Sequence, residues 1–167
     1  MNLFASRPRL TTGVSSAAFA LFLISQPIHA QSGGIFAGLD GNWSGTGTIL
    51  VADGGSEKIR CRATYTVSPD STGLQQNLRC ASDSYKFELT TDIHSQGSHV
   101  GGYWSESTRN INGSLDGSGT NGEFNVLVSA NGFSAELNLK LSGGKQTIVM
   151  NSKNTDLRGL NISLSKS

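Results

Sequence analysis

From Trp43 to the end of the chain, apolar and polar residues alternate in short runs, and Gly, Asn, Asp and Ser cluster between the runs. A period of two places every second side chain on the same face of an extended strand. For example, Ile59 and Cys61 share one face, whereas Arg60 and Arg62 share the other. No window of this region shows the 3.6-residue period of an amphipathic helix. The pattern therefore predicts an all-β fold of about ten antiparallel strands.

The stretch ANGF, residues 130–133, lies between two of these runs and predicts a tight hairpin. Asn-Gly is the favoured pair for a two-residue turn because both positions need a positive φ. Pairing outward from this turn places Val128 opposite Ala135 and Val126 opposite Leu137. Each pair joins two residues of the apolar face, so the turn chemistry and the hydrophobic pattern predict the same register.

Strands with one apolar face can bury that face in a closed antiparallel barrel, here of about 8–10 strands, or in a β-sandwich. We expect a single barrel domain over residues 38–167, with the sandwich as the alternative. A membrane barrel also has one apolar and one polar face. However, the chain has few aromatic residues for two interfacial girdles and ends in the polar run SLSKS. The pattern thus favours a soluble barrel with an apolar interior.

Residues 1–30 have the composition of a secretory signal peptide. They contain no acidic residue and carry two arginines, which are followed by the apolar run Val14–Ile24. We predict cleavage after residue 30. The apolar run is much shorter than the roughly 20 residues of a spanning helix, so we predict no transmembrane segment. We expect an exported protein, periplasmic or secreted, in which residues 31–37 form a flexible lead-in to the barrel.

The overall charge of the chain is close to balanced, with 13 basic and 12 acidic residues. Two of the basic residues lie in the predicted signal peptide. Nucleic-acid-binding domains usually carry a clear basic excess, so we expect no nucleic-acid partner. The sequence also lacks a G-x-S-x-G nucleophile elbow. We therefore predict neither an enzymatic activity nor a cofactor.

The only two cysteines of the chain, Cys61 and Cys80, bracket a predicted hairpin. If Val67 opposes Leu74 across the turn SPDSTG, the same register places Cys61 directly opposite Cys80. A zinc site needs more ligands at close spacing, and redox pairs usually read C-x-x-C. In an exported protein, this arrangement favours a structural disulfide.

The register of the cysteine hairpin also places Arg62 opposite Arg79 on the outer face. A two-residue turn at 82–83 would bring Lys86 beside Arg79, with Arg60 nearby. We call these four cations the basic stripe. Because like charges directly opposite each other are unfavourable, the stripe is either tolerated in solvent or meets an anion. These residues are the candidates for binding an anionic envelope component, such as a lipid headgroup or an acidic glycan.

Several aromatic residues fall on the predicted inner face, namely Trp43, Tyr65, Tyr85, Phe87, Trp104, Phe124 and Phe133. They could fill the core, or they could line a cavity in a barrel wider than eight strands. Four glycines on or near that face would leave further space, namely Gly45, Gly47, Gly102 and Gly113. The aromatic residues are therefore the candidates for contacting a small ligand inside the barrel.

Asp92, His94 and His99 surround the stretch SQGS and could meet at one metal ion. Their spacing is not a recognised ligand motif, and the pattern favours exposed loop residues near a strand end. We therefore predict no metal site.

The tripeptide Gly41-Asn42-Trp43 resembles the G-x-W opening of lipocalin-like and avidin-like barrels, the calycin group. In lipocalins this tryptophan closes the barrel floor and packs against an arginine near the last strand, a part that Arg158 could take here. The resemblance implies a small exported antiparallel β-barrel.

Together, these patterns predict an exported β-barrel that binds a small apolar or amphipathic ligand in its interior. The alternative is a non-enzymatic structural or interaction module of the cell envelope that uses the basic stripe on its outer face. An internal cavity lined by the aromatic residues would separate the two hypotheses. The oligomeric state stays open.

Overall fold

The computed structural model of the protein describes residues 33–120, 122–153 and 155–167. The predicted signal peptide lies outside these residues. The described chain forms ten strands, β1 (Gly41–Val51), β2 (Ser56–Val67), β3 (Gly73–Ala81), β4 (Lys86–Gln96), β5 (His99–Glu106), β6 (Ile111–Thr120), β7 (Glu123–Ala130), β8 (Phe133–Ser142), β9 (Lys145–Ser152) and β10 (Leu157–Lys166). Within these described ranges, no helix is long and apolar enough to cross a membrane.

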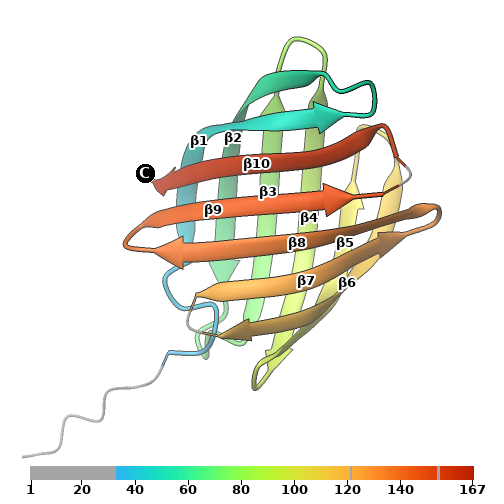
Figure 1. The fold of residues 1–167 in the computed structure, drawn as a ribbon. Coiled ribbons are helices and arrows are strands. Elements are labelled where there is room, and N and C mark those ends of the chain that lie inside the picture. Colours follow the sequence, from blue (N-terminus) through green and yellow to red (C-terminus); the bar gives the residue numbers. More distant parts are fainter. Residues whose placement is uncertain (1–32, 121, 154) are drawn as a thin grey trace, which may run out of the picture. The chain divides into compact units, whose positions relative to one another are not determined.

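The ten strands form a closed antiparallel barrel. Each strand pairs with its neighbours in sequence, and β10 pairs with β1 to complete the ring. The predicted all-β barrel is therefore confirmed, and the sandwich alternative is not the fold. Strands β8–β10 cross in front of β3 and β4 at a steep angle, and β1 bends from one layer to the other (Figure 1). The barrel is thus flattened into two layers joined at corners.

Glycine permits the sharp bends of the barrel wall. A Cβ atom built on Gly45 would overlap the carbonyl oxygen of Ser163 on β10, and one on Gly113 would overlap that of Ser129 on β7. Only a residue without a side chain tolerates so close an approach of a neighbouring backbone. The expectation that the inward glycines leave cavity space is wrong, because adjacent backbone closes in on all four of them, Gly45, Gly47, Gly102 and Gly113.

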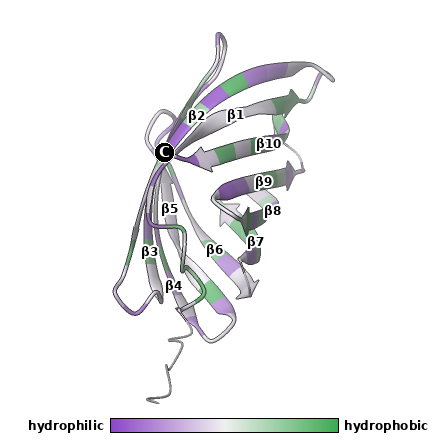
Figure 2. Ribbon diagram, turned by 90° about the vertical axis from the view of Figure 1, so that its left-hand side faces the viewer, coloured by the Kyte–Doolittle hydropathy of each residue, from purple (hydrophilic) through white to green (hydrophobic). Residues whose placement is uncertain are grey.

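The alternation seen in the sequence becomes an apolar interior and a polar exterior. Figure 2 shows hydrophobic and hydrophilic residues following one another along the strands. The turn at Asn131-Gly132 sets Val128 against Ala135 and Val126 against Leu137, which confirms the predicted register. The most deeply buried residues include Ile49, Ile59, Ile162 and Leu164. Burial of such apolar side chains is the main force that favours folding.

Cys61 and Cys80 are direct cross-strand partners on β2 and β3. Their Sγ atoms are 2.07 Å apart and both residues are buried, so the predicted disulfide is confirmed. Val67 opposes Leu74 at the turn end of the same hairpin, as the sequence predicts. The disulfide closes a loop between residues 19 positions apart.

Residues that precede β1 close one end of the barrel, which we call the floor. Phe36 and Leu39 are buried, and Phe36 stacks on Phe124 with ring centroids 5.6 Å apart. The indole N–H of Trp43 donates a hydrogen bond to the Leu39 carbonyl oxygen at 2.7 Å. The predicted domain boundary at residue 38 therefore needs correction. The packed structure already includes Phe36, which falls within the predicted flexible lead-in.

Candidate ligand-binding cavity

A cavity of about 620 Å³ occupies the barrel interior above the floor. Every strand except β1 contributes lining side chains, and most of them are aliphatic or aromatic. Phe36 and Leu39 bound the cavity at the floor. The exposed residues Asn131 and Gly132 line it at the opposite end, where the β7–β8 turn lies. We call this opposite end the open end, because the lining there reaches solvent.

Many apolar side chains face the interior and are nevertheless only partly buried. Leu78 on β3, Val126 on β7 and Leu137 on β8 are examples. A close-packed core would bury such side chains almost completely. Their partial exposure therefore means that protein atoms do not fill the middle of the barrel. The sequence was compatible with either a filled core or a cavity, and the structure has a cavity.

Six of the seven aromatic residues predicted to face the ligand line the cavity, namely Tyr65, Tyr85, Phe87, Trp104, Phe124 and Phe133. Trp43 does not line it. Its indole lies in the floor and meets the Tyr65 ring edge to face, with centroids 6.3 Å apart. Sequence reasoning missed the aliphatic residues as lining, although their inward positions were evident from the alternation.

Lys166, and not Arg158, is the cation that packs on Trp43. Its Nζ atom lies 5.7 Å from the centroid of the Trp43 ring and donates a hydrogen bond to the Gly38 carbonyl oxygen at 3.2 Å. Antiparallel pairing of β1 with β10 sets Trp43 opposite Lys166. Arg158 lies near the other end of β10 and is exposed. The part suggested for Arg158 by the lipocalin resemblance is therefore taken by Lys166.

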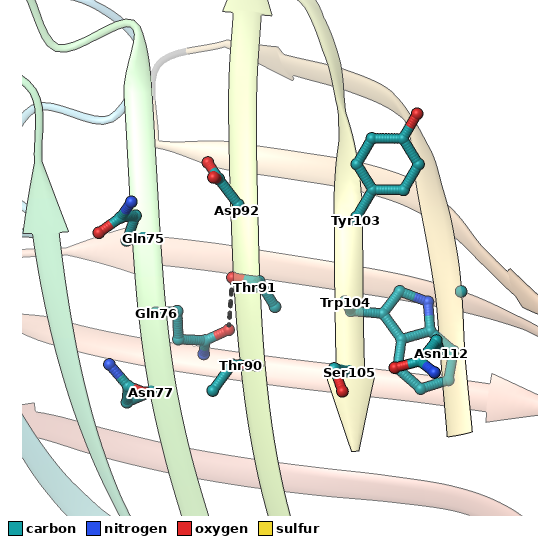
Figure 3. Close-up of a pocket in the computed structure, with 11 residues that line it drawn as sticks. Gln75, Gln76, Asn77, Thr90, Thr91, Asp92, Tyr103, Trp104, Ser105 and Asn112 are labelled. Atoms are coloured by element: carbon teal, nitrogen blue, oxygen red, sulfur yellow. Dashed lines mark hydrogen bonds between the residues drawn. The ribbon is translucent and has the colours of Figure 1, made fainter. Parts of the chain in front are cut away.

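A chain of hydrogen bonds between polar side chains crosses the barrel near the floor. The Tyr65 hydroxyl donates to Gln146 Oε1 at 2.9 Å and accepts from Gln76 Nε2 at 3.0 Å. The Thr91 hydroxyl donates to Gln76 Oε1 at 3.4 Å (Figure 3). We call these four residues the polar chain. Three of them, Tyr65, Gln76 and Thr91, line the cavity.

Burial decides the ionisation of the polar chain. It raises the pKa of Tyr65 to about 12, so the phenol is protonated at neutral pH. The Nε2 atom of Gln146 is buried and has no hydrogen-bond partner among the described residues. Sequence reasoning missed Gln146 and did not single out Gln76 or Thr91. Gln76 and Thr91 could have been found from the sequence, because each is a polar residue at an inward position of a predicted strand.

Arg109 and Glu106 organise the open end. The Arg109 guanidinium lies over the Phe87 ring, 5.6 Å from its centroid. The Glu106 carboxylate accepts hydrogen bonds from the backbone N–H groups of Glu88, Thr108 and Arg109 at 2.8–3.0 Å. Burial raises the pKa of Glu106, but these hydrogen bonds and the Thr108 hydroxyl outweigh it and hold the pKa below its usual value. The carboxylate therefore fixes the β5–β6 turn that borders the cavity.

On the outer face, Arg62 lies opposite Arg79 as predicted, but the predicted place of Lys86 is wrong. Residue 79 is paired with Glu88, and Lys86 is paired with Ala81. The tip of the β3–β4 turn falls at 83–84, because the backbone N–H of Ser82 bonds to the Tyr85 carbonyl. The position of this turn shifts the pairing of β3 with β4 by two residues from the predicted register. As a result, the acidic residue Glu88 lies inside the basic stripe.

The two described histidines are far from the interior. His94 and His99 are exposed, and His99 Nε2 lies 2.8 Å from Asp116 Oδ2 instead of joining Asp92. In the part of the chain that the structure covers, no three His, Cys, Asp or Glu side chains are grouped to hold a metal ion.

No protein-family model matches the chain, and no curated protein sequence matches it significantly. Solved structures do share its fold. Rv2717c from M. tuberculosis superposes with a TM-score of 0.63 at 10% identity, covering 77% of this chain and 92% of that chain. The S-type phycobiliprotein lyase CPES from Guillardia theta gives a TM-score of 0.51 at 8% identity, covering 77% and 88%. Together with the closed ten-strand barrel, these neighbours fit a calycin-like fold of lipocalin type.

Proposed function

We propose that the protein binds a small apolar or amphipathic molecule inside the barrel. The observation that carries this proposal is the interior cavity, whose inward apolar side chains are left partly uncovered. Its volume of about 620 Å³ lies within the range of roughly 300–1,000 Å³ that is common for small-molecule sites. A binding role, rather than a catalytic one, suits a lining of this composition.

Burial of the ligand's hydrocarbon would drive the binding. Each methylene group removed from water contributes about 0.8 kcal/mol. A ligand with about ten buried methylene groups would therefore gain about 8 kcal/mol, which is offset in part by the cost of association. Because the lining is mostly apolar, this contribution should exceed that of any hydrogen bond to the ligand.

The polar chain favours an amphipathic ligand over a plain hydrocarbon. One amide hydrogen of Gln76 and the lone pairs of the Thr91 hydroxyl are not used within the chain. Both residues line the cavity, so a ligand hydroxyl or carbonyl could bond to them. A ligand that left these buried donors and acceptors without hydrogen-bond partners would bind less tightly than one that bonds to them. We infer that the polar group of the ligand points toward the floor.

We also infer that the protein is exported. The buried disulfide between Cys61 and Cys80 supports this inference, because disulfides persist mainly in oxidising compartments. Purification from the periplasm or the medium of its own host, followed by native mass spectrometry, tests both points together. A small molecule retained by the barrel is the expected result.

Adjacent positions on β7 provide a matched test of the cavity. Val126 points inward and lines it, whereas Leu127 points outward and is 49% exposed. Val126→Trp should fill part of the cavity and weaken the binding of an apolar fluorescent probe, such as N-phenylnaphthylamine, by about tenfold or more. Leu127→Trp should bind the probe like the wild type. Equal binding by both folded variants would contradict the proposal.

The basic stripe supports a second candidate function, in which the outer face binds an anionic envelope component. Arg62 and Arg79 face each other across β2 and β3, and neither belongs to any ion pair found among the described residues. Glu88 lies opposite Arg79 and offsets part of their mutual repulsion, and a bound anion would offset the rest. Binding to vesicles that contain anionic lipid, lost in the Arg62→Ser/Arg79→Ser variant, would support this function. Wild-type binding by that variant would exclude it.

A further inference from the structure

A hollow of about 450 Å³ lies on the outer face of the barrel, over strands β3–β6. We call it the outer groove. Its base is the strand wall, to which Gln76, Thr91, Trp104 and Gly113 belong, and its rim is made of outward-facing side chains (Figure 3). The outer groove therefore lies on the opposite side of the wall from the interior cavity.

The rim of the outer groove combines polar groups of several kinds with one aromatic ring. It holds the side chains of Gln75, Asn77, Thr90, Asp92, Tyr103, Ser105 and Asn112. Figure 3 marks one hydrogen bond among the residues drawn, between the inward-facing Gln76 and Thr91. The outward polar groups are thus not bonded to one another, and their donors and acceptors are free to meet a ligand.

Tyr103 stands clear of its surroundings and is 72% exposed, more than the other exposed large hydrophobic residues. Its outward neighbours along β5 are Gly101 and Ser105, and across the sheet it lies between Asp92 and Ser114. All four neighbours are short or lack a side chain. The ring is therefore a freely accessible aromatic surface flanked by hydrogen-bonding groups.

We propose that the outer groove binds a neutral saccharide. A sugar ring has an apolar C–H face, which can stack on the electron-rich face of Tyr103. Its hydroxyl groups both donate and accept, so they match amides such as Asn77 and Asn112 and the Asp92 carboxylate. A groove that is polar apart from one aromatic ring suits such a ligand better than it suits a hydrocarbon.

The charges around the outer groove select a neutral sugar over an acidic one. Asp92 is the one ionisable carboxylate among its described lining residues, and none of these residues is a lysine or arginine. An acidic saccharide would meet the Asp92 charge with no cation among the lining residues to offset it. The proposal is independent of the interior ligand, because the two sites lie on opposite sides of the strand wall.

Binding of short neutral malto-, cello- and chito-oligosaccharides, measured by isothermal titration calorimetry on the wild-type protein, tests the proposal. At least one series should bind, and Tyr103→Ala should weaken it by tenfold or more. Leu127→Ala is the matched control, because Leu127 is also an exposed apolar residue on the outer face, and it should bind like the wild type. Val126→Trp, which fills the interior, should also leave saccharide binding unchanged.

Three outcomes would overturn the proposal. One is that none of the three neutral series binds, and another is that Tyr103→Ala binds as tightly as the wild type. The third is that only acidic oligosaccharides bind and that Arg62→Ser/Arg79→Ser abolishes this, which would assign glycan binding to the basic stripe. Thermal melting of each variant shows whether a loss of binding reflects a loss of fold.

Discussion

Replacing Tyr65 with phenylalanine tests the polar chain near the floor of the barrel. Tyr65 is 2% exposed, and its hydroxyl bonds to both Gln146 and Gln76. Phenylalanine keeps the ring but leaves the buried Gln146 amide without its partner. An unsatisfied buried polar group costs about 1–3 kcal/mol. The variant should be less stable than the wild type by about that amount at pH 8.

The stability difference between the wild type and this variant should also depend on pH, because only the wild type carries the Tyr65 phenol. Burial raises the pKa of Tyr65 to about 12, whereas an unfolded tyrosine ionises near its ordinary value of 10.0. The folded state therefore holds the proton more tightly. This contribution is fully present below about pH 10 and is lost as the pH rises through about 12. The total loss of stability is about 3 kcal/mol at pH values well above 12, and about 1.4 kcal/mol of it has occurred by pH 11.

Urea unfolding of both proteins at about pH 8 and pH 11, followed by tryptophan fluorescence, measures these two quantities. Tyr85, Tyr103 and the lysines occur in both proteins, so their titration cancels in the difference. The stability gap between wild type and Tyr65→Phe should narrow by about 1.4 kcal/mol at the higher pH. A gap that stays constant across this range would refute the assignment of a raised Tyr65 pKa. No gap at pH 8 would refute a stabilising polar chain.

Three further substitutions test the fold. Cys61→Ala/Cys80→Ala should lower the free energy of unfolding by about 3 kcal/mol in the chain-entropy picture, and reductant should destabilise the wild type but not the variant; an unchanged urea midpoint would contradict this. Gly113→Ala should destabilise the barrel by about 1–3 kcal/mol. The added Cβ would lie 2.6 Å from the Trp104 indole and overlap neighbouring backbone. An unchanged near-ultraviolet circular dichroism spectrum would count against this close approach of residue 113 to the indole. Phe36→Ala should cost about 3–5 kcal/mol in thermal or urea unfolding, whereas a flexible lead-in would show no loss.

The sequence by itself determined the strands and the pairing within hairpins. Alternation with a period of two assigns each residue of β7 and β8 to a face, and Asn131-Gly132 fixes the turn that aligns them. The partnership of Cys61 and Cys80 follows in the same way from their hairpin. These features depend on residues close together in the chain, where steric limits on φ and ψ and hydrophobic pattern act locally.

The exact position of the β3–β4 turn could not be predicted from the local sequence. Moving the tip of the β3–β4 turn by one residue keeps every inward residue inside, so the hydrophobic pattern does not distinguish the two registers. It does decide whether Lys86 or Glu88 faces Arg79. The composition of the basic stripe was therefore predicted only in part.

Only the tertiary structure decided how the barrel closes and what its interior holds. Pairing of β1 with β10 brings Lys166 to Trp43, and the Tyr65 hydroxyl meets Gln146 across 81 residues of sequence. Whether the interior is filled depends on the strand number and on bends at glycines such as Gly45, which set the distance between the walls. The outer groove around Tyr103 likewise combines side chains from four neighbouring strands, β3–β6. Contacts of this kind are set by the closed geometry of the whole sheet, which no local pattern encodes.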